Sequence, residues 1–394
     1  MSKRSILVNF AILVPALALC AAVLSTVSCG GGLFPEVTAT STSSATPTPG
    51  TGEFGYVTDF NTGKVVKLTR NTSSGGITPG QAVKAGATQG PKGLALTFSN
   101  DFLYVANNKD NNVYAYSIQS NGVPSPLPTA SFSDGSGSGP EQIAINPSST
   151  LLWVTNGGSS STPGSITFYA INSSSGELTN NGSLSGLSSP FGVITDGTYL
   201  YVADHGAGNV NSYTIDTSTG GLTLLSSVSN LGSGVTGGTP VKLAFDPSGS
   251  FIYVDDQDTG AVSSIAVSSG ALSQAVPFFP SSSIDPIGLA IAQLSSGNFL
   301  LAAYQGTNQI GSYLISPAGT LLTPNLSTST NVQAPTGIVV DPQFANAYTA
   351  NQNDGTVAQW TLTGSCGATV CFVGKMQTES GSSTSGPFDL ILTH

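Results

Sequence analysis

The sequence has little charge of either sign and almost no arginine or histidine. Only 8% of its 394 residues are charged, and its 20 acidic residues outnumber its 10 basic ones. Arginine occurs only at positions 4 and 70, and histidine only at positions 205 and 394. A chain with a net charge of −10 and no cluster of basic residues repels a phosphate backbone, which excludes nucleic acid as a partner.

Long apolar runs are also absent, except near the start of the chain. Residues 6–24 are almost continuously apolar and follow Lys3 and Arg4. A basic start, an apolar run and then small residues are typical of an export signal, which we expect to span residues 1–29. No later run reaches the ~20 apolar residues of a membrane span, so we expect the remainder to be a soluble domain held at a membrane surface.

Cysteine is scarce as well, and its four positions lie near the two ends of the chain. Cys20 lies inside the expected signal, whereas Cys29 stands at its end. The segment 26–29 resembles the lipobox of bacterial lipoproteins, although Thr26 stands where leucine is usual. We therefore expect Cys29 to carry a lipid, and Gly30 favours the outer membrane by the same resemblance. An ordinary secretory signal and an uncleaved anchor remain the alternatives.

An exported location explains two further segments. Residues 30–52 consist mostly of Ser, Thr, Pro and Gly, which cannot form a core, so we expect a flexible tether. Cys366 and Cys371 enclose a short segment that contains Gly367, and we expect them to form a disulfide that closes a hairpin. A metal pair is the alternative, but no histidine or further cysteine lies nearby in the sequence.

Proline recurs at a nearly constant interval through the rest of the chain. In the repeat that begins at Pro240, the pattern predicts strands over 240–245, 250–254 and 261–267, and a fourth that runs to about residue 277. A period near fifty residues built from strands is typical of a β-propeller. The prolines that begin the repeats, spaced 46 to 52 residues apart, are Pro91, Pro140, Pro190, Pro240, Pro286, Pro335 and Pro387.

The two ends of the chain complete the count of blades. Residues 387–394 supply only a first strand, whereas residues 53–59, 64–69 and about 81–85 supply the other three. We expect the C-terminal strand to pair with the N-terminal ones, which closes the ring and removes an open edge. The sequence therefore predicts an all-β domain over 53–394, a seven-bladed β-propeller with four-stranded blades. Two stacked sandwiches, the alternative, do not explain why the strand missing at one end lies at the other.

Several second strands resemble those of a known family. The stretches 104–107 (Tyr-Val-Ala-Asn), 153–156 and 201–204 resemble the strand motif of YVTN-type propellers. The stretch 246–254 resembles the seven-bladed lactonase family, which includes 6-phosphogluconolactonases. The resemblance implies the propeller fold over 53–394 and the opening of lactone rings as an activity. It also implies that Arg and His follow the first-strand prolines.

Polar residues collect where the second strands end, on the face that surrounds the channel mouth. They could bind sugar hydroxyls, a peptide or Ca²⁺, although Asn, Asp and Gly also simply form turns. Residues 255–258 lack the spacing and terminal Glu of an EF-hand loop, so we assign no metal site and no cofactor. We expect a monomer that binds a glycan or an envelope protein. The candidate ligand-binding residues are Asn107, Lys109, Asp110, Asn156, Asp204, His205, Asp255, Asp256, Asp258, Gln305, Asn351, Asn353 and Asp354.

The residues that a lactonase needs are mostly missing from the predicted mouth. Such an enzyme activates water with a base and stabilises an oxyanion, and a phosphorylated substrate needs further cations. No arginine follows the seven prolines; His205 with Asp204 or Glu141 is the remaining candidate for a base. Lys92 or Lys242 could supply positive charge. The sequence therefore favours a membrane-tethered binding module, with a lactonase-type hydrolase as the alternative and a passive structural or adhesive module as a third option.

Replacing Cys29 with serine tests the predicted anchor. Lipidation at this position requires the thiol, so we expect Cys29→Ser to abolish incorporation of labelled palmitate and to release the protein from membranes, while Cys20→Ser changes neither. Globomycin should block processing of the natural chain. Labelling that persists in Cys29→Ser, or that is missing from the natural chain, would contradict a lipoprotein signal.

Overall fold

The computed structural model describes residues 53–133, 138–229, 238–280, 285–328, 331–343, 345–362, 369–378 and 385–393. The predicted signal (1–29) and tether (30–52), with Cys29, lie outside the described residues, and so does Cys366. Lipidation and the disulfide to Cys371 therefore stay predictions.

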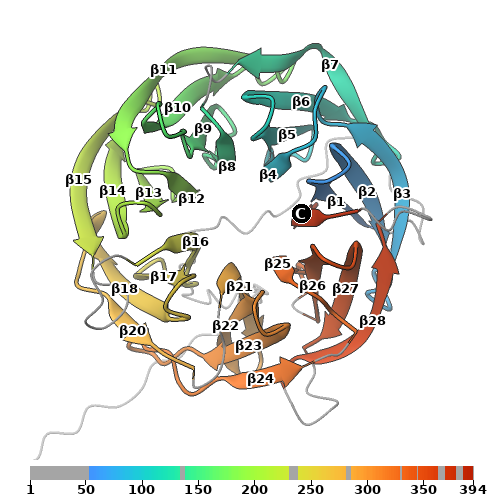
Figure 1. Cartoon of the computed structure of the whole chain (residues 1–394), viewed down its shortest axis with the longest axis vertical. Coiled ribbons are helices and arrows are strands. Elements are labelled where there is room, and N and C mark those ends of the chain that lie inside the picture. The colour runs from blue at the N-terminus through green and yellow to red at the C-terminus, as the bar shows by residue number, and fades with distance from the viewer. Residues whose placement is uncertain are drawn as a thin grey trace, which may run out of the picture. The chain divides into compact units, whose positions relative to one another are not determined.

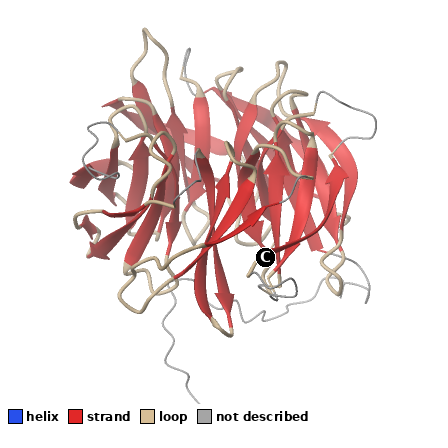
Figure 2. Ribbon diagram, turned by 60° about the horizontal axis from the view of Figure 1, so that its bottom comes forward, coloured by secondary structure: helices blue, strands red, loops and turns tan. Residues whose placement is uncertain are grey.

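The described residues form seven antiparallel sheets around a central axis, which confirms the predicted seven-bladed propeller (Figure 1). Figure 2 shows only strands joined by loops, and none of the described segments is a helix that could cross a membrane.

The strands of each blade lie side by side from the axis outwards. In that order, blade 1 contains β29 (Pro387–Leu392), β1 (Glu53–Asp59), β2 (Lys64–Arg70) and β3 (Ile77–Lys84); blade 2 contains β4 (Pro91–Leu96), β5 (Phe102–Asn107), β6 (Asn112–Ile118) and β7 (Pro124–Ser133); blade 3 contains β8 (Pro140–Ile145), β9 (Leu151–Asn156), β10 (Gly164–Ile171) and β11 (Leu178–Leu187). Blade 4 contains β12 (Pro190–Thr195), β13 (Tyr199–Asp204), β14 (Asn209–Ile215) and β15 (Leu222–Ser229); blade 5 contains β16 (Pro240–Phe245), β17 (Phe251–Asp256), β18 (Val262–Ser268), β19 (Ala271–Leu272) and β20 (Val276–Phe278); blade 6 contains β21 (Pro286–Leu294), β22 (Gly297–Tyr304), β23 (Gln309–Leu314) and β24 (Asn325–Thr328); blade 7 contains β25 (Pro335–Val340), β26 (Asn346–Asn351), β27 (Thr356–Thr361) and β28 (Cys371–Gln377).

The last strand of the chain closes the ring, as predicted. β29 pairs antiparallel with β1, with Tyr56 opposite Ile391 and Val57 opposite Leu390. The C-terminal strand thereby completes the blade that the N-terminal strands begin, and β1 has no open edge.

Two fourth strands differ from the sequence prediction. β3 begins at Ile77, earlier than the expected start at Gln81. In blade 5 the fourth strand is divided into β19 and β20, both of which pair with β18. The interruption has a local cause, because the hydroxyl of Ser273 accepts the N–H of Ala266 at 3.0 Å and so replaces a backbone partner.

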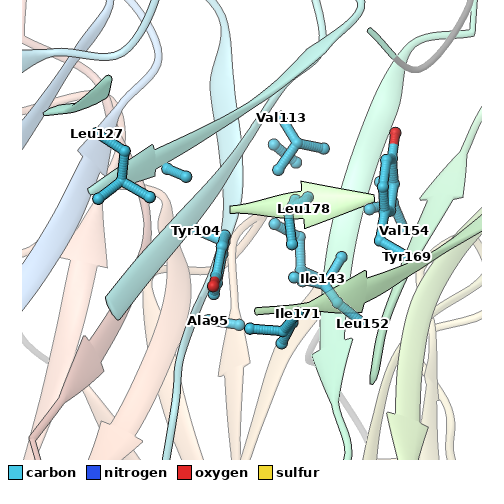
Figure 3. Close-up of a cluster of buried hydrophobic side chains, with 12 residues drawn as sticks. Ala95, Tyr104, Val113, Leu127, Ile143, Leu152, Val154, Tyr169, Ile171 and Leu178 are labelled. Atoms are coloured by element: carbon cyan, nitrogen blue, oxygen red, sulfur yellow. The ribbon is translucent and has the colours of Figure 1, made fainter. Parts of the chain in front are cut away.

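The hydrophobic core lies between neighbouring blades rather than within one. Figure 3 shows the cluster between blades 2 and 3, where Tyr104 and Val113 pack with Ile143 and Leu152. The second strand of blade 3 is buried at every position. Burial on both faces explains why the inner strands read as continuous apolar runs instead of alternating.

A second-strand aromatic residue ties each of five blades to the next one. Tyr104 donates its hydroxyl hydrogen to the carbonyl of Gly176 in blade 3, 2.8 Å away. Gly176 has φ +73°, in the left-handed region that favours glycine, at the turn between the third and fourth strands. The equivalent bonds run from Tyr56 to Gly122, Trp153 to Gly220, Tyr253 to Gly319 and Tyr348 to Gly75.

Around the channel, glycine allows three first strands to approach the next blade closely. The second residue after the proline is glycine in blades 2, 4 and 6, and it lies against the carbonyl of the residue that follows the next proline. A Cβ at Gly192 would stand 2.2 Å from the oxygen of Val241, and a Cβ at Gly288 would stand 2.2 Å from that of Thr336. At Gly93 the oxygen of Glu141 would be 2.6 Å away.

At two other junctions between blades, a threonine hydroxyl donates a hydrogen bond to the equivalent carbonyl, that of the residue after the next blade's proline. Thr58 of blade 1 donates to the carbonyl oxygen of Lys92 at 2.7 Å, and Thr155 of blade 3 donates to that of Phe191. Each hydroxyl also accepts an N–H from the second residue after the proline in its own blade. These residues are Asp389 and Gln142. Blades 1 and 3 therefore have room for a polar side chain where blades 2, 4 and 6 have glycine.

Adding a single methyl group at Gly192 tests this close packing. Gly192→Ala would place a Cβ against the rigid backbone of β16, and we expect a loss of about 1–3 kcal/mol in the free energy of unfolding, measured with urea. Gly374→Ala is the matched control, since no atom lies within 4 Å of the added Cβ and the residue is also in a strand. Equal stability of the two variants would contradict the packing described here.

Candidate functional site

Two adjoining cavities lie on the channel axis. The mouth cavity has a volume of about 210 Å³ and is lined mainly by residues that directly follow the first-strand prolines and by three glutamines. The channel cavity has a volume of about 160 Å³ and is lined by residues further along the first strands, among them Gln142, Lys242 and Asp389. Lys242 lines both cavities, so the two are adjacent.

The prolines determine which residues reach these cavities. Pro91 lies opposite Asn107, the last residue of the second strand, and Pro240 lies opposite Asp256 in the same way. In both blades the register shifts after the proline, which has no N–H to donate to the ladder. The residues within this irregular stretch, Lys92 and Lys242 among them, line the cavities.

Lys92 and Glu141, from blades 2 and 3, form an ion pair at the mouth. Nζ of Lys92 lies 2.6 Å from Oε2 of Glu141, and the two side chains are 17% and 10% exposed. The other carboxylate oxygen accepts a hydrogen bond from Nδ2 of Asn108 at 2.8 Å. Burial raises the pKa of the Glu141 carboxyl above its ordinary value, against the opposing effect of the Lys92 charge. Glu141 therefore holds a proton more readily than an exposed glutamate does.

Two phenylalanines contact the ammonium group of Lys92, and a third packs against one of them. The lysine Nζ lies 5.4 Å from the ring centroid of Phe191 and 5.7 Å from that of Phe388. These two rings are 6.4 Å apart, and Phe388 is 6.2 Å from Phe60. Contact with ring faces stabilises a partly buried cation, and the rings give the mouth an apolar wall.

A second ion pair crosses the channel. Lys242 of blade 5 contacts Asp389 of blade 1, with Nζ and Oδ2 2.9 Å apart and side chains 17% and 14% exposed. The second oxygen of Asp389 accepts the N–H of Leu390 at 3.0 Å. Both lysines that line the cavities thus have a carboxylate partner, and their charges are balanced.

Glutamines line the side of the mouth formed by blades 5, 6 and 7. Gln257, Gln305 and Gln352 each follow directly after a second strand and line the mouth cavity. Nε2 of Gln305 donates to Oε1 of Gln352 at 3.1 Å. Because an amide group both donates and accepts hydrogen bonds, this side can bind hydroxyl or carbonyl groups.

Most residues of the set predicted to bind a ligand do not line either cavity. Five of them end second strands and are buried, and their side chains bond nearby backbone groups or hydroxyls. Asp204 accepts the N–H of Ser188 at 3.0 Å, and Asp256 accepts that of Thr239 at 3.2 Å. Both bonds fix the segment that leads into a first strand. The five residues are Asn107, Asn156, Asp204, Asp256 and Asn351.

Two further predicted residues have similar structural contacts. Asp110 accepts the N–H of Ala87 at 2.8 Å and the hydroxyl of Tyr114 at 2.9 Å. Asp354 pairs with Lys375 at 3.0 Å. These contacts shape the turns of blades 2 and 7.

Of the remaining predicted residues, Asp255 is buried in β17, whereas Lys109, Asp258, Gln305 and Asn353 lie in turns that follow second strands. Nζ of Lys109 lies 6.0 Å from the ring centroid of Phe60, whereas Asp258 and Asn353 are exposed in turns. Gln305 is the member of the predicted set that lines the mouth cavity. In the described part of the chain, no three or more His, Cys, Asp and Glu side chains gather so as to hold a metal ion.

The candidate base His205 and its two candidate partners, Asp204 and Glu141, differ in their placement. His205 is half-buried, and its Nδ1 has no hydrogen-bond partner among the described residues. Burial raises the pKa of the neighbouring Asp204 carboxyl, but that carboxyl is used by Ser188. Glu141 alone of the three contacts a residue that lines the mouth cavity, namely Lys92.

Sequence reasoning missed most of the residues that line the mouth. The sequence suggests Lys92 as a source of positive charge, whereas nothing in it singles out Phe191 and Phe388. The partner of Lys242 lies 147 positions away in Asp389, and no local pattern indicates that contact. The regular position after each proline is the signal that could have identified these residues.

The comparisons with known proteins agree with this architecture. The model of the family described as lactonase, 7-bladed beta-propeller, matches residues 35–236 and 192–283. A search among curated proteins found no match. A solved putative 6-phosphogluconolactonase from Bacteroides fragilis is similar with a TM-score of 0.72 and 15% identity, over 89% of this chain and 100% of that one.

Two more solved structures are similar at low sequence identity. A periplasmic gluconolactonase from Pseudomonas aeruginosa has a TM-score of 0.68 and 17% identity, over 87% of this chain and 99% of that one. A protein from Lactobacillus plantarum has a TM-score of 0.70 and 18% identity, over 87% and 100%. These identities establish the shared fold alone. The family model, in contrast, covers more than half of the chain, and the chain therefore belongs to the seven-bladed β-propeller lactonase family.

Proposed function

We propose that the channel mouth hydrolyses a small, uncharged lactone. The observation that carries the proposal is the presence of two lysine–carboxylate pairs, Lys92 with Glu141 and Lys242 with Asp389, at cavities otherwise lined by amides, aromatic rings and aliphatic groups. Family membership and the similarity to solved gluconolactonases support it. This proposal places the hydrolase ahead of the binding module, the reverse of the order that the sequence favoured.

Hydrolysis of a lactone requires a base, a positive group and a proton donor. Glu141 is the proposed base, because its raised pKa favours acceptance of a proton from water. The water oxygen forms a bond to the lactone carbonyl carbon while Glu141 takes the proton. Negative charge then develops on the carbonyl oxygen, where the ammonium of Lys242 stabilises it. The bond to the ring oxygen breaks, and Glu141 returns the proton to that oxygen, which gives a hydroxy acid.

The charge balance of the mouth favours a substrate without phosphate. A phosphate group needs cations that are not already neutralised, whereas Lys92 and Lys242 both have carboxylate partners within 3 Å. Gln257, Gln305 and Gln352 supply neutral donors and acceptors suited to hydroxyl groups. A polyhydroxylated, uncharged lactone fits both features.

We further propose that this domain works outside the cytoplasm on a lipid tether. The export signal over 1–29, the Ser/Thr/Pro/Gly-rich segment 30–52 and the lipobox-like Cys29 support this location. The periplasmic location named for the Pseudomonas aeruginosa gluconolactonase supports it as well.

Replacement of the proposed base tests the mechanism. We expect Glu141→Gln to lower kcat for glucono-δ-lactone by roughly 100-fold or more, because glutamine keeps the shape but accepts no proton. In the natural chain the acid limb of kcat/KM should lie above pH 4.5, the ordinary pKa of a glutamate, since only the carboxylate form acts as a base.

Glu177→Gln is the control, because Glu177 lies in the turn between β10 and β11, away from the mouth. Its kcat should equal that of the natural chain. If Glu141→Gln retains full activity, Glu141 is not the base; if the natural chain hydrolyses no lactone yet shows a thermal shift with oligosaccharides, the mouth is a binding site and the hydrolase proposal is wrong.

The preference for an uncharged substrate gives a separate prediction. We expect kcat/KM for glucono-δ-lactone to exceed that for its 6-phosphate by tenfold or more, which is about 1.4 kcal/mol of transition-state binding. Paired progress curves at equal substrate concentrations, followed by the release of acid, measure the ratio. A higher kcat/KM for the phosphorylated lactone would show that the lysines are available to phosphate.

A further inference from the structure

Asp255 occupies in blade 5 the position that Thr58 holds in blade 1 and Thr155 holds in blade 3. Each stands directly before the last residue of its second strand. Each side-chain oxygen accepts the N–H of the second residue after the proline in its own blade. For Asp255 this is the N–H of Lys242, 2.6 Å from Oδ1, and the corresponding distances at Thr58 and Thr155 are 3.0 Å and 3.2 Å. Three blades thus share one buried contact.

The threonines make a second contact that a carboxylate cannot make. Their hydroxyl hydrogens go to the carbonyl of the residue that follows the next proline, Lys92 in one case and Phe191 in the other. In blade 6 the residue that follows the proline is Ile287, which lines the mouth cavity beside Lys242. The repeat of the fold therefore points to the carbonyl of Ile287 as the group equivalent to the carbonyls of Lys92 and Phe191.

One oxygen of Asp255 is left for this contact. Oδ1 accepts the N–H groups of Val241 at 3.2 Å and Lys242 at 2.6 Å, whereas Oδ2 has no hydrogen-bond partner among the described residues. The residue is fully buried. An ionised carboxylate here would leave a buried, charged oxygen without a hydrogen-bond donor, which is costly. A proton on Oδ2 removes that cost and supplies the missing donor.

The groups around Asp255 agree with a bound proton. Burial raises its pKa to about 8; the N–H bonds and the Lys242 charge oppose this shift, and the neighbouring Asp256 adds to it. The ammonium of Lys242 is turned to Asp389, at 2.9 Å. The phenol of Tyr304 in blade 6 also faces this group, and its hydroxyl is hydrogen-bonded to that of Tyr313.

We propose that Asp255 is a neutral carboxylic acid in the folded chain and donates its Oδ2 hydrogen to the carbonyl of Ile287, so that it joins blade 5 to blade 6 as the threonines join their blades. Asp255 is also a positioning residue for Lys242, since it holds the amide of that residue in the channel wall. The inference does not rest on the proposed hydrolysis, and its test measures folding rather than turnover.

A proton kept by the folded chain makes stability depend on pH in a defined direction. The pKa of Asp255 is about 8 in the folded chain, against 3.8 for an ordinary aspartate. Between these values the unfolded chain releases a proton that the folded chain keeps, so folding stability from this group falls as pH rises. Its contribution is complete below pH 3.8, declines up to about pH 8 and is constant above that.

The test compares the natural domain with Asp255→Asn, Asp255→Thr and Asp256→Asn by thermal unfolding between pH 4.5 and 8.5. Asparagine keeps the acceptor for both N–H groups and donates through Nδ2 without a titrating proton, and threonine reproduces blades 1 and 3. We expect both Asp255 variants to melt several degrees higher than the natural domain at pH 8 and to show a flatter pH dependence. Asp256→Asn removes one charge that raises the pKa of Asp255 but leaves the proton of Asp255 in place, so this variant should still lose stability as pH rises.

Infrared spectroscopy gives a second readout that needs no change in stability. A protonated carboxyl has its own C=O band, which should be present at pH 7 in the natural domain and reduced in Asp255→Thr. A variant that melts lower than the natural domain at pH 8 with an unchanged slope, or a carboxylic acid band that is unaltered by the substitution, would overturn the proposal. If Asp255→Asn does not fold, the threonine variant and the infrared band decide alone.

Discussion

The contact between neighbouring first strands around the channel controls the chemistry of this propeller. Six of the seven blades present the carbonyl that follows their proline to the preceding blade, and we propose the same for blade 6. At Gly93, Gly192 and Gly288 that carbonyl leaves no space for a side chain. In blades 1 and 3 a hydroxyl bonds it instead, and the neighbouring position carries Asp389 and Gln142. With Lys242 of blade 5, these are the polar residues that the first strands supply to the channel cavity.

Blade 7 has both a glycine and a threonine hydroxyl at its contact with the next blade. The packing of the first strands is therefore set separately at each junction between blades. Gly337 would meet Asp389 if it had a Cβ, and Thr336 donates its hydroxyl to the carbonyl of Phe388 at 2.7 Å. The polar channel residues are therefore not distributed by chance along the repeats. They occur in blades 1, 3 and 5, where a buried polar side chain on the second strand bonds the backbone of the first strand, and the first strand carries a polar residue instead of glycine. This arrangement places Lys242 and Asp389 on opposite sides of the channel, where they form an ion pair.

The sequence allowed the fold to be predicted because its signals are local. The structure confirms the first strands that begin at the seven prolines, among them the strand at 240–245. It also confirms the blade that the two ends of the chain share. The residues that line the mouth were harder to predict, because a sequence shows which residues are polar but not which of them are buried. Their polarity predicts Asn156 and Asp204 as ligand-binding residues, yet both side chains are buried. The pair of Lys242 with Asp389 depends on closure of the whole ring, which no single repeat records.

A crystal structure of the domain with the hydroxy acid product of glucono-δ-lactone would show where a ligand binds. We expect density for the product in the mouth cavity, with its carboxylate beside the ammonium of Lys242 and its hydroxyls on Gln257, Gln305 or Gln352. Density confined to the outer turns at Asp258 and Asn353, with the mouth cavity empty at saturating product, would contradict this expectation.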